Sequence, residues 1–161
     1  MSIDLLIEPV RPIRVTPLLP KIAVVLADML GLSTPPALAM ERLEEGRPLP
    51  VVTDQVGVVK GPLLLISIAG EPETVALLGG ADHLGVTISG QRSSLLYALG
   101  AAIAIALARE LGSRVWDDRK FFGHEVHTSP ETLFEGLRVR GRHSDYRDAA
   151  ENITWGPAGG S

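Results

Sequence analysis

The strongest hydrophobic pattern in this sequence is an unbroken run of fourteen apolar or small residues, LLYALGAAIAIALA, from Leu95 to Ala108. Ser93 or Ser94 precedes the run as a helix N-cap, and Gly112 follows it as a typical C-terminal residue. The run is shorter than the roughly 20 residues that span a bilayer. It therefore predicts a buried central helix from about Ser93 to Leu111. Because this helix is apolar almost all round, its outer side also needs cover, from the rest of the chain or from a second subunit.

An earlier segment predicts a second long helix, which ends at Gly31. Thr16 and Pro17 form a start signal, with Thr16 as N-cap and Pro17 at the first helical position. Gly31 is a typical residue to follow a helix, and Pro35 and Pro36 prevent its continuation. The apolar residues between these signals recur at helical spacing: Ile22, Val25, Leu26, Met29 and Leu30.

The remaining apolar segments are short and separated by turn residues, which indicates strands. Pro62–Ala69 is nearly continuous in apolar character, so we expect burial on both of its faces. A short strand carries Trp116, which we expect in the core, and Ser129 caps a short helix that begins at Pro130. The other expected strands are Ile3–Ile7, Ala39–Leu43, Leu49–Thr53, Thr74–Leu78 and His83–Ser89, with Val56–Lys60 either a strand or a loop.

This order of elements predicts an α+β fold. We expect a mostly antiparallel sheet of about five or six strands, with two main helices packed on it, one of them the apolar central helix. Residues 1–140 form the single domain in this prediction. Residues 141–161 are polar and end in GPAGGS, so we expect a polar C-terminal tail.

Composition narrows the function classes. The hydrophobic fraction of 45% predicts a globular protein. The formal net charge of -4 argues against nucleic-acid binding and is compatible with a basic protein partner. The absence of cysteine excludes disulfides, thiolate nucleophiles and cysteine-ligated metals. Acids at Asp4 and Glu8, with no basic segment before the first strand, argue against a signal peptide. We therefore expect a cytoplasmic protein that does not enter a membrane.

Candidate chemistry centres on the segment His124-Glu125-Val126-His127. Its histidines are three residues apart, whereas the zinc-protease motif needs them four apart on a helix. A small metal-dependent enzyme that uses His124, Glu125, His127 and Asp117 is one alternative. The sequence has neither a Gly-x-Ser-x-Gly elbow nor a phosphate-binding Gly-Lys-Ser/Thr motif. We expect no catalytic residues, no metal and no cofactor.

The chain resembles immunity proteins of bacterial polymorphic-toxin systems. The resemblance lies in the short N-terminal strand, in the meander from Leu63 to Ser89, and in the alanine-rich helix that runs into Arg114-Val115-Trp116-Asp117-Asp118. It implies a cytoplasmic, non-catalytic protein that neutralises a toxin by direct binding through an acidic surface.

We expect the acidic side chains that meet this toxin to be exposed at the ends of secondary-structure elements. The expected partner-binding residues are Glu41, Glu44, Glu45, Asp117 and Asp118. The second alternative is a dimeric structural or regulatory module in which the central helix seals the interface between two copies of the chain.

Overall fold

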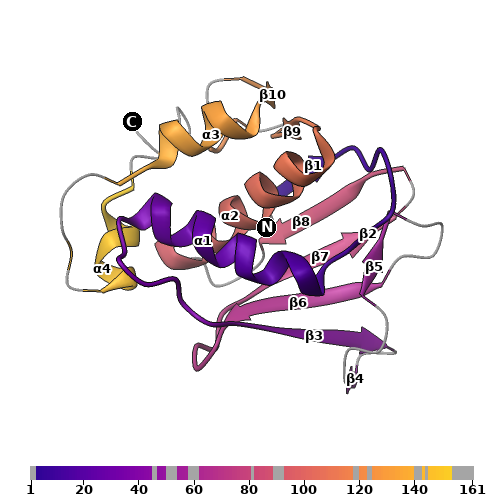
Figure 1. The fold of residues 1–161 in the computed structure, drawn as a ribbon, viewed down its shortest axis with the longest axis horizontal. Coiled ribbons are helices and arrows are strands. Elements are labelled where there is room, and N and C mark those ends of the chain that lie inside the picture. The colour runs from indigo at the N-terminus through magenta and orange to yellow at the C-terminus, as the bar shows by residue number, and fades with distance from the viewer. Residues whose placement is uncertain are drawn as a thin grey trace.

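The protein folds into two layers, a sheet and a group of helices on one of its faces (Figure 1). The computed structural model describes residues 3–44, 47–49, 54–57, 62–80, 82–88, 93–117, 120–122, 125–139, 143 and 145–153. The α+β class predicted from the sequence is confirmed, as is the apolar helix packed on the sheet.

All neighbouring strands of the main sheet are antiparallel, and their order is β10-β9-β1-β8-β7-β6-β3-β4. This sheet of eight strands is wider than the five or six expected, because β4, β9 and β10 are only two or three residues long. The strands are β1 (Ile3–Ile7), β3 (Leu38–Glu44), β4 (Arg47–Leu49), β6 (Leu63–Ile68), β7 (Thr74–Gly79), β8 (Leu84–Ile88), β9 (Val115–Trp116) and β10 (His127–Thr128). A separate two-stranded ribbon pairs β2 (Ile13–Arg14) with β5 (Gln55–Val56).

The helices begin and end largely at the predicted signals. The Ser93 hydroxyl accepts the backbone N–H of Leu96 at 3.1 Å, and Gly112 adopts the left-handed conformation at φ 65°. Ser129 caps the following helix in the same way, at the N–H of Thr132. The helices are the 3-10 turn η1 (Thr16–Leu18), α1 (Leu19–Leu30), α2 (Ser94–Leu111), α3 (Pro130–Leu137) and α4 (Tyr146–Glu151).

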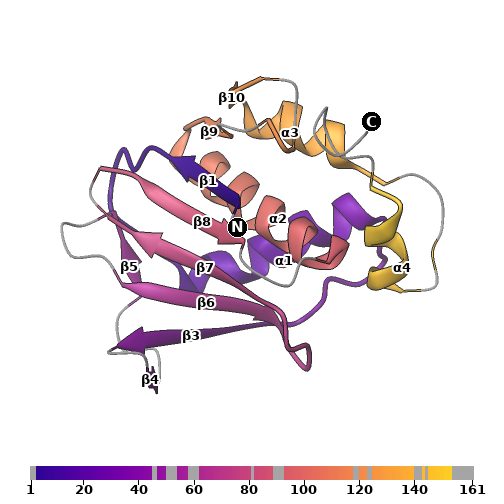
Figure 2. The same cartoon turned by 180° about the vertical axis from the view of Figure 1, so that it is seen from behind.

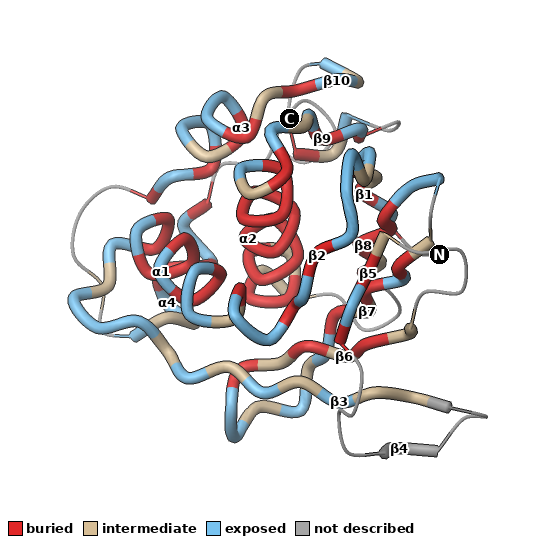
Figure 3. Tube along the Cα trace, turned by 45° about the vertical axis from the view of Figure 1, so that its right-hand side comes forward, coloured by how far each residue is buried: buried red, intermediate tan, exposed pale blue. Residues whose placement is uncertain are grey.

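The central helix α2 is covered on both sides by its own chain. One side packs on the sheet, where a Cβ at Gly100 would lie 2.4 Å from Ile88 Cδ1. On the other side α2 contacts α1, α3 and α4. Figure 3 shows α2 buried along nearly its whole length. A second subunit is therefore not needed to cover this helix.

Helix α4 corrects the expectation of a polar tail for residues 145–153. Ala149 and Ala150 are fully buried and belong to the hydrophobic core, as does Ile153. The sequence pattern hid this contact because α4 is only six residues long and its buried side is made of two alanines.

The start of the first helical segment differs from the prediction, because Thr16 is not an N-cap. It is the first residue of η1, and its backbone N–H donates to Asp54 Oδ2 at 2.7 Å. Arg14 Nε donates to Asp54 Oδ1 at 3.0 Å. Burial pushes the pKa of Asp54 upward, but the hydrogen bonds from Thr16 and Arg14 outweigh it, so this pKa lies below its ordinary value of 3.8. A carboxylate from a distant loop thus fixes the entry into α1.

Strand β6 also differs from its prediction, because only one of its faces is fully buried. Leu64, Ile66 and Ile68 point into the core, whereas the alternate residues from Leu63 to Ser67 are half-buried. The apolar character of Leu63 and Leu65 therefore belongs to a different surface, the opposite face of the sheet.

We expect Asp54→Ala to lower the free energy of unfolding by about 1–3 kcal/mol, because it leaves the N–H of Thr16 without its acceptor. Asp28→Ala removes an exposed acid from α1 and serves as the control, with a change within about 0.5 kcal/mol. Urea denaturation at pH 7 measures both values, and equal effects would contradict the capping role of Asp54.

Two glycines should respond to alanine in opposite directions. A Cβ at Gly79 would lie 2.5 Å from Val56 Cγ1 and 3.1 Å from Val56 Cα, so Gly79→Ala should cost about 1–3 kcal/mol. Gly136 lies in helix α3, and a Cβ there would meet no atom within 4 Å, so Gly136→Ala should add up to about 1 kcal/mol. Thermal unfolding of both variants distinguishes the packed position from the open one.

Candidate functional site

The face of the sheet opposite the helices is the candidate functional surface, which we call the open face. Within the described residues no helix lies against it (Figure 2). Directly paired residues of neighbouring antiparallel strands point to the same face, so the register defines which side chains meet there. One row on the open face is apolar from strand β3 to strand β9 and crosses seven strands in the order Leu43, Leu63, Leu78, Gly85, Leu6, Trp116 and His127.

The next row on the open face carries an acid at each end. Glu41 lies at the β3 end and Asp4 at the β1 end, and both are exposed. Asp4 Oδ1 accepts the hydroxyl of Thr87 at 2.8 Å, which holds this carboxylate on the face. Between the two acids the paired residues are Leu65, Ala76 and Thr87. The apolar row is therefore bordered by negative charge.

Two large side chains of the apolar row are unusually accessible. Leu78 is 50% exposed and Trp116 is 44% exposed. The indole of Trp116 stacks on the imidazole of His127, with ring centroids 4.9 Å apart and an interplanar angle of 29°. The expectation that Trp116 is a core residue is therefore wrong. Its ring is an aromatic anchor that faces solvent.

A hollow of about 520 Å³ lies at the β9 end of the apolar row. Leu6, Trp116 and His127 line it from the open face, and Val10 lines it from the loop after β1. The charged side chains around it are Glu8, Asp82 and Arg114, and all three residues are exposed. We call this feature the Trp116 hollow.

Among the predicted partner-binding acids, the structure describes the side chains of Glu41 and Asp117. Glu41 is exposed on the open face, as described above. Glu44 is the last residue of β3, but its side chain, like Glu45 and Asp118, lies outside the described residues. The expectation of an exposed Asp117 is wrong, because this residue is 3% exposed.

The buried carboxylate of Asp117 organises the turn after β9. Its Oδ2 accepts the backbone N–H of Phe122 at 2.7 Å, and its backbone N–H donates to the carbonyl of Val126 at 2.7 Å. Its carbonyl accepts the N–H of Lys120, which adopts a positive φ of 52°. These bonds place Phe121 and Phe122 against Tyr97 on α2. Asp117 is therefore a positioning residue for this turn.

The residues of the metal-enzyme alternative differ in burial where the structure describes them. His124 lies outside the described residues, whereas Glu125 and His127 are exposed and Asp117 is buried. In the described part of the chain, no three His, Asp or Glu side chains gather closely enough to hold a metal ion.

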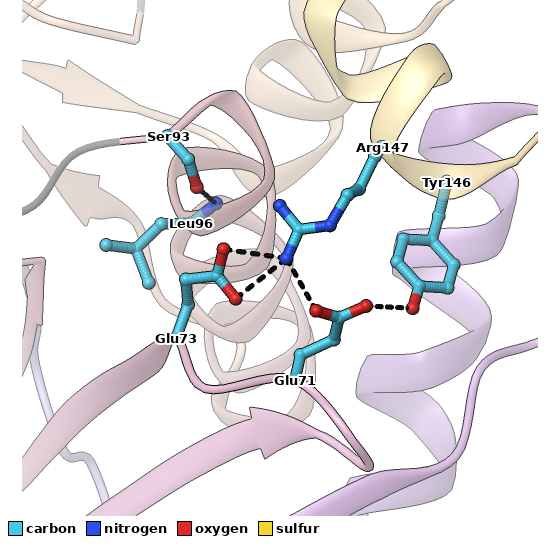
Figure 4. Close-up of polar contacts among 6 residues, drawn as sticks. All are labelled: Glu71, Glu73, Ser93, Leu96, Tyr146 and Arg147. Atoms are coloured by element: carbon cyan, nitrogen blue, oxygen red, sulfur yellow. Dashed lines mark hydrogen bonds and ion pairs between the residues drawn. The ribbon is translucent and has the colours of Figure 1, made fainter.

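A second polar cluster joins helix α4 to the turn between β6 and β7 (Figure 4). Arg147 Nη2 lies 2.5 Å from Glu71 Oε2 and 2.8 Å from Glu73 Oε1. The Tyr146 hydroxyl donates to the other oxygen of Glu71. These contacts tie α4 to the turn between β6 and β7.

The contacts in this cluster shift three pKa values. Hydrogen bonds from Tyr146 and Arg147 hold the pKa of Glu71 below its ordinary value of 4.5. The hydrogen bond to Glu71 raises the pKa of Tyr146 above its ordinary value of 10.0. Hydrogen bonds to Glu71 and Glu73 raise the pKa of Arg147. The cluster is therefore complete when the acid is ionised and the tyrosine is protonated.

The open face is not evident from any single segment of the sequence, although the alternation of strand residues is one signal for it. Strand residues alternate between faces, so a buried Val115 places its neighbour Trp116 on the opposite side. The same alternation turns Leu6 outward between the buried Leu5 and Ile7.

Removing Arg147 should destabilise the fold only at pH values at which Glu71 is charged. The depressed pKa of Glu71 means that the cluster stabilises the fold above about pH 4.5, and that this contribution is lost as the pH falls through the lower folded value. We expect Arg147→Met to lower the urea midpoint at pH 7, with a much smaller difference at pH 3. Arg138→Met is the control, because the ion pair of Arg138 with Glu135, at 3.9 Å, lies on the surface. An equal loss at both pH values would contradict the ionic role of the cluster.

Comparison with known proteins adds no relative to this description. No protein-family model matches the chain, and no curated protein and no solved structure matches it either. The assignment of a function therefore rests on the geometry of the open face.

Proposed function

We propose that this chain is a non-catalytic binding protein that neutralises a protein partner by covering it with the open face of its sheet. The observation that carries the proposal is the apolar row that ends at Trp116. A contiguous apolar surface rimmed by polar groups is typical of a protein interface. The row gives the partner a solid, preformed surface, because backbone hydrogen bonds fix its seven strands relative to one another.

The size of the row suits a standard protein interface. Seven strands spaced about 4.8 Å apart span about 29 Å between the first and the last. A standard interface buries about 800 Å² on each partner, which is a patch of similar width. Trp116 and Leu78 are its most accessible large residues. Tryptophan is among the residues that dominate binding energy at such interfaces, so Trp116 is the proposed anchor.

The charge of the open face indicates a basic partner. Glu41 and Asp4 border the apolar row, and the formal net charge of the chain is -4. Opposite charges at the rim of an interface accelerate association and suppress wrong partners. Together with the resemblance to immunity proteins, these features make a cognate toxin the proposed partner, and Glu41 replaces Asp117 as the acid that meets it.

The proposed location is the cytoplasm. Helix α2 is long and apolar enough to cross a membrane, but 78% of it is buried inside the fold, which supports its role as a core helix. The alternative of a dimer sealed by α2 receives no support from this arrangement. The same experiment tests self-association through the open face.

The test is co-expression of the chain with the product of the adjacent gene. We expect the chain to protect cells from that product and to form a complex with it. The double variant Leu78→Glu, Trp116→Ala should weaken the complex more than 100-fold, because each change removes an anchor worth about 2 kcal/mol. Val24→Glu is the matched control, since Val24 is 47% exposed but lies on α1 in the helix layer.

Three outcomes would overturn the proposal. A neighbouring product that is harmless alone, or that stays toxic while no complex forms, would exclude the immunity function. A complex that tolerates the double variant but not Val24→Glu would place the interface on the helices. A mass that rises with concentration in the absence of any partner, and that the double variant abolishes, would assign the open face to self-association.

A further inference from the structure

Two exposed acids lie at the rim of the Trp116 hollow. Glu8 and Asp82 are exposed at its rim, and the described residues supply neither with an ion pair. Other acids nearby are neutralised. Glu110 at the end of α2 accepts a hydrogen bond from Lys21 Nζ at 2.8 Å, and Arg109 Nε lies 3.1 Å from Glu131. The carboxylates at the hollow are therefore placed to meet a cation that enters it.

The Trp116 side of the hollow is suited to a flat cation. Trp116 is 44% exposed although one side of its ring stacks on His127, so indole surface remains accessible. An aromatic ring attracts a cation placed over its face, and the planar guanidinium of arginine also stacks on it. Lysine is a compact and strongly hydrated charge that gains less from such a surface. The volume of about 520 Å³ leaves room for a whole side chain and its flanking backbone.

We propose that the Trp116 hollow receives an arginine side chain of the protein partner, with the guanidinium against the indole of Trp116 and paired with Glu8 and Asp82. This inference rests on the proposed function and names the chemistry of the contact at one end of the interface. It also accounts for the position of Val10, which is 61% exposed beside the hollow and covers the methylene groups of the incoming side chain.

The charge of Arg114 predicts whether each substitution at the hollow strengthens or weakens binding. Arg114 is the one Lys or Arg among the residues that line the described hollow, and it leaves a formal charge of -1 when Glu8 and Asp82 are counted with it. Because it repels an incoming guanidinium, its removal should strengthen binding. Loss of Glu8 and Asp82 should weaken binding. A hollow that recognises an anion would show the opposite pattern.

The test uses two short peptides as probes. Acetyl-Gly-Arg-Gly-amide carries the cation, and acetyl-Gly-citrulline-Gly-amide has nearly the same shape without the charge. Binding to the full chain is followed by the chemical shift of the indole N–H of Trp116 in a ¹H–¹⁵N spectrum, assigned with Trp155→Phe. We expect the arginine peptide to bind at least about threefold more tightly than the citrulline peptide, as for a pair of exposed ion contacts.

Variants then separate the parts of the site. Glu8→Gln with Asp82→Asn should abolish the preference for arginine, and Arg114→Gln should increase affinity for the arginine peptide about twofold to fivefold. Trp116→Leu should weaken both peptides, with the backbone amide of Val115 as the reporter. Asp28→Asn is the matched control, because it removes an exposed acid from α1 in the helix layer.

Equal affinity for the two peptides, or an unchanged preference in the Glu8→Gln, Asp82→Asn variant, would overturn the proposal. Weaker binding of the arginine peptide by Arg114→Gln would also overturn it. The peptide titration does not require the toxin, so its failure is separable from that of the proposed function. A toxin complex that forms through Leu78 and Trp116, with no arginine preference at the hollow, would retain the interface and reject the arginine contact.

Discussion

The whole architecture depends on the need to bury helix α2 on every side. Fourteen of its residues are buried, and its helical surface offers no polar stripe that could face water. The sheet covers one side, and α1, α3 and α4 cover the other. Even the six-residue helix α4 takes part, through two alanines small enough to let its backbone approach closely. The salt-bridged cluster around Arg147 then holds that short helix in place, since two alanines alone bury little apolar area.

Because the helices gather around α2, one face of the sheet is left open. The other α-helices of the described chain all contact α2, so none of them remains to shield the far side of the sheet (Figure 2). A sheet can face water on one side, but the exposed side then usually alternates to polar residues. Here the row through Leu78 and Trp116 stays apolar. These exposed apolar side chains contribute nothing to the core. We therefore assign binding to the open face.

The sequence predicted the elements that local signals define. Serine caps, glycine ends and the run from Leu95 to Ala108 marked α2 and α3 closely, because each signal acts within a few residues. Features that depend on distant partners were missed. The acceptor that fixes η1 comes from Asp54, 38 residues away, and not from Thr16. Asp117 looked like a surface acid because its hydrogen bond to Phe122 forms only in a folded turn. The open face required the register of seven strands, which no single segment contains.

The position of β1 in the sheet also sets an order of events during synthesis. Strands β6, β7 and β8 follow one another along the chain and pair with tight turns, so they can assemble as soon as they leave the ribosome. Strand β1 leaves first, yet it pairs with β8 on one side and with β9 on the other. Strand β1 must therefore wait for its sheet partners until β8 has been made. During that interval Leu5 and Ile7 are exposed, and the nascent chain depends on its surroundings to keep them from wrong pairings.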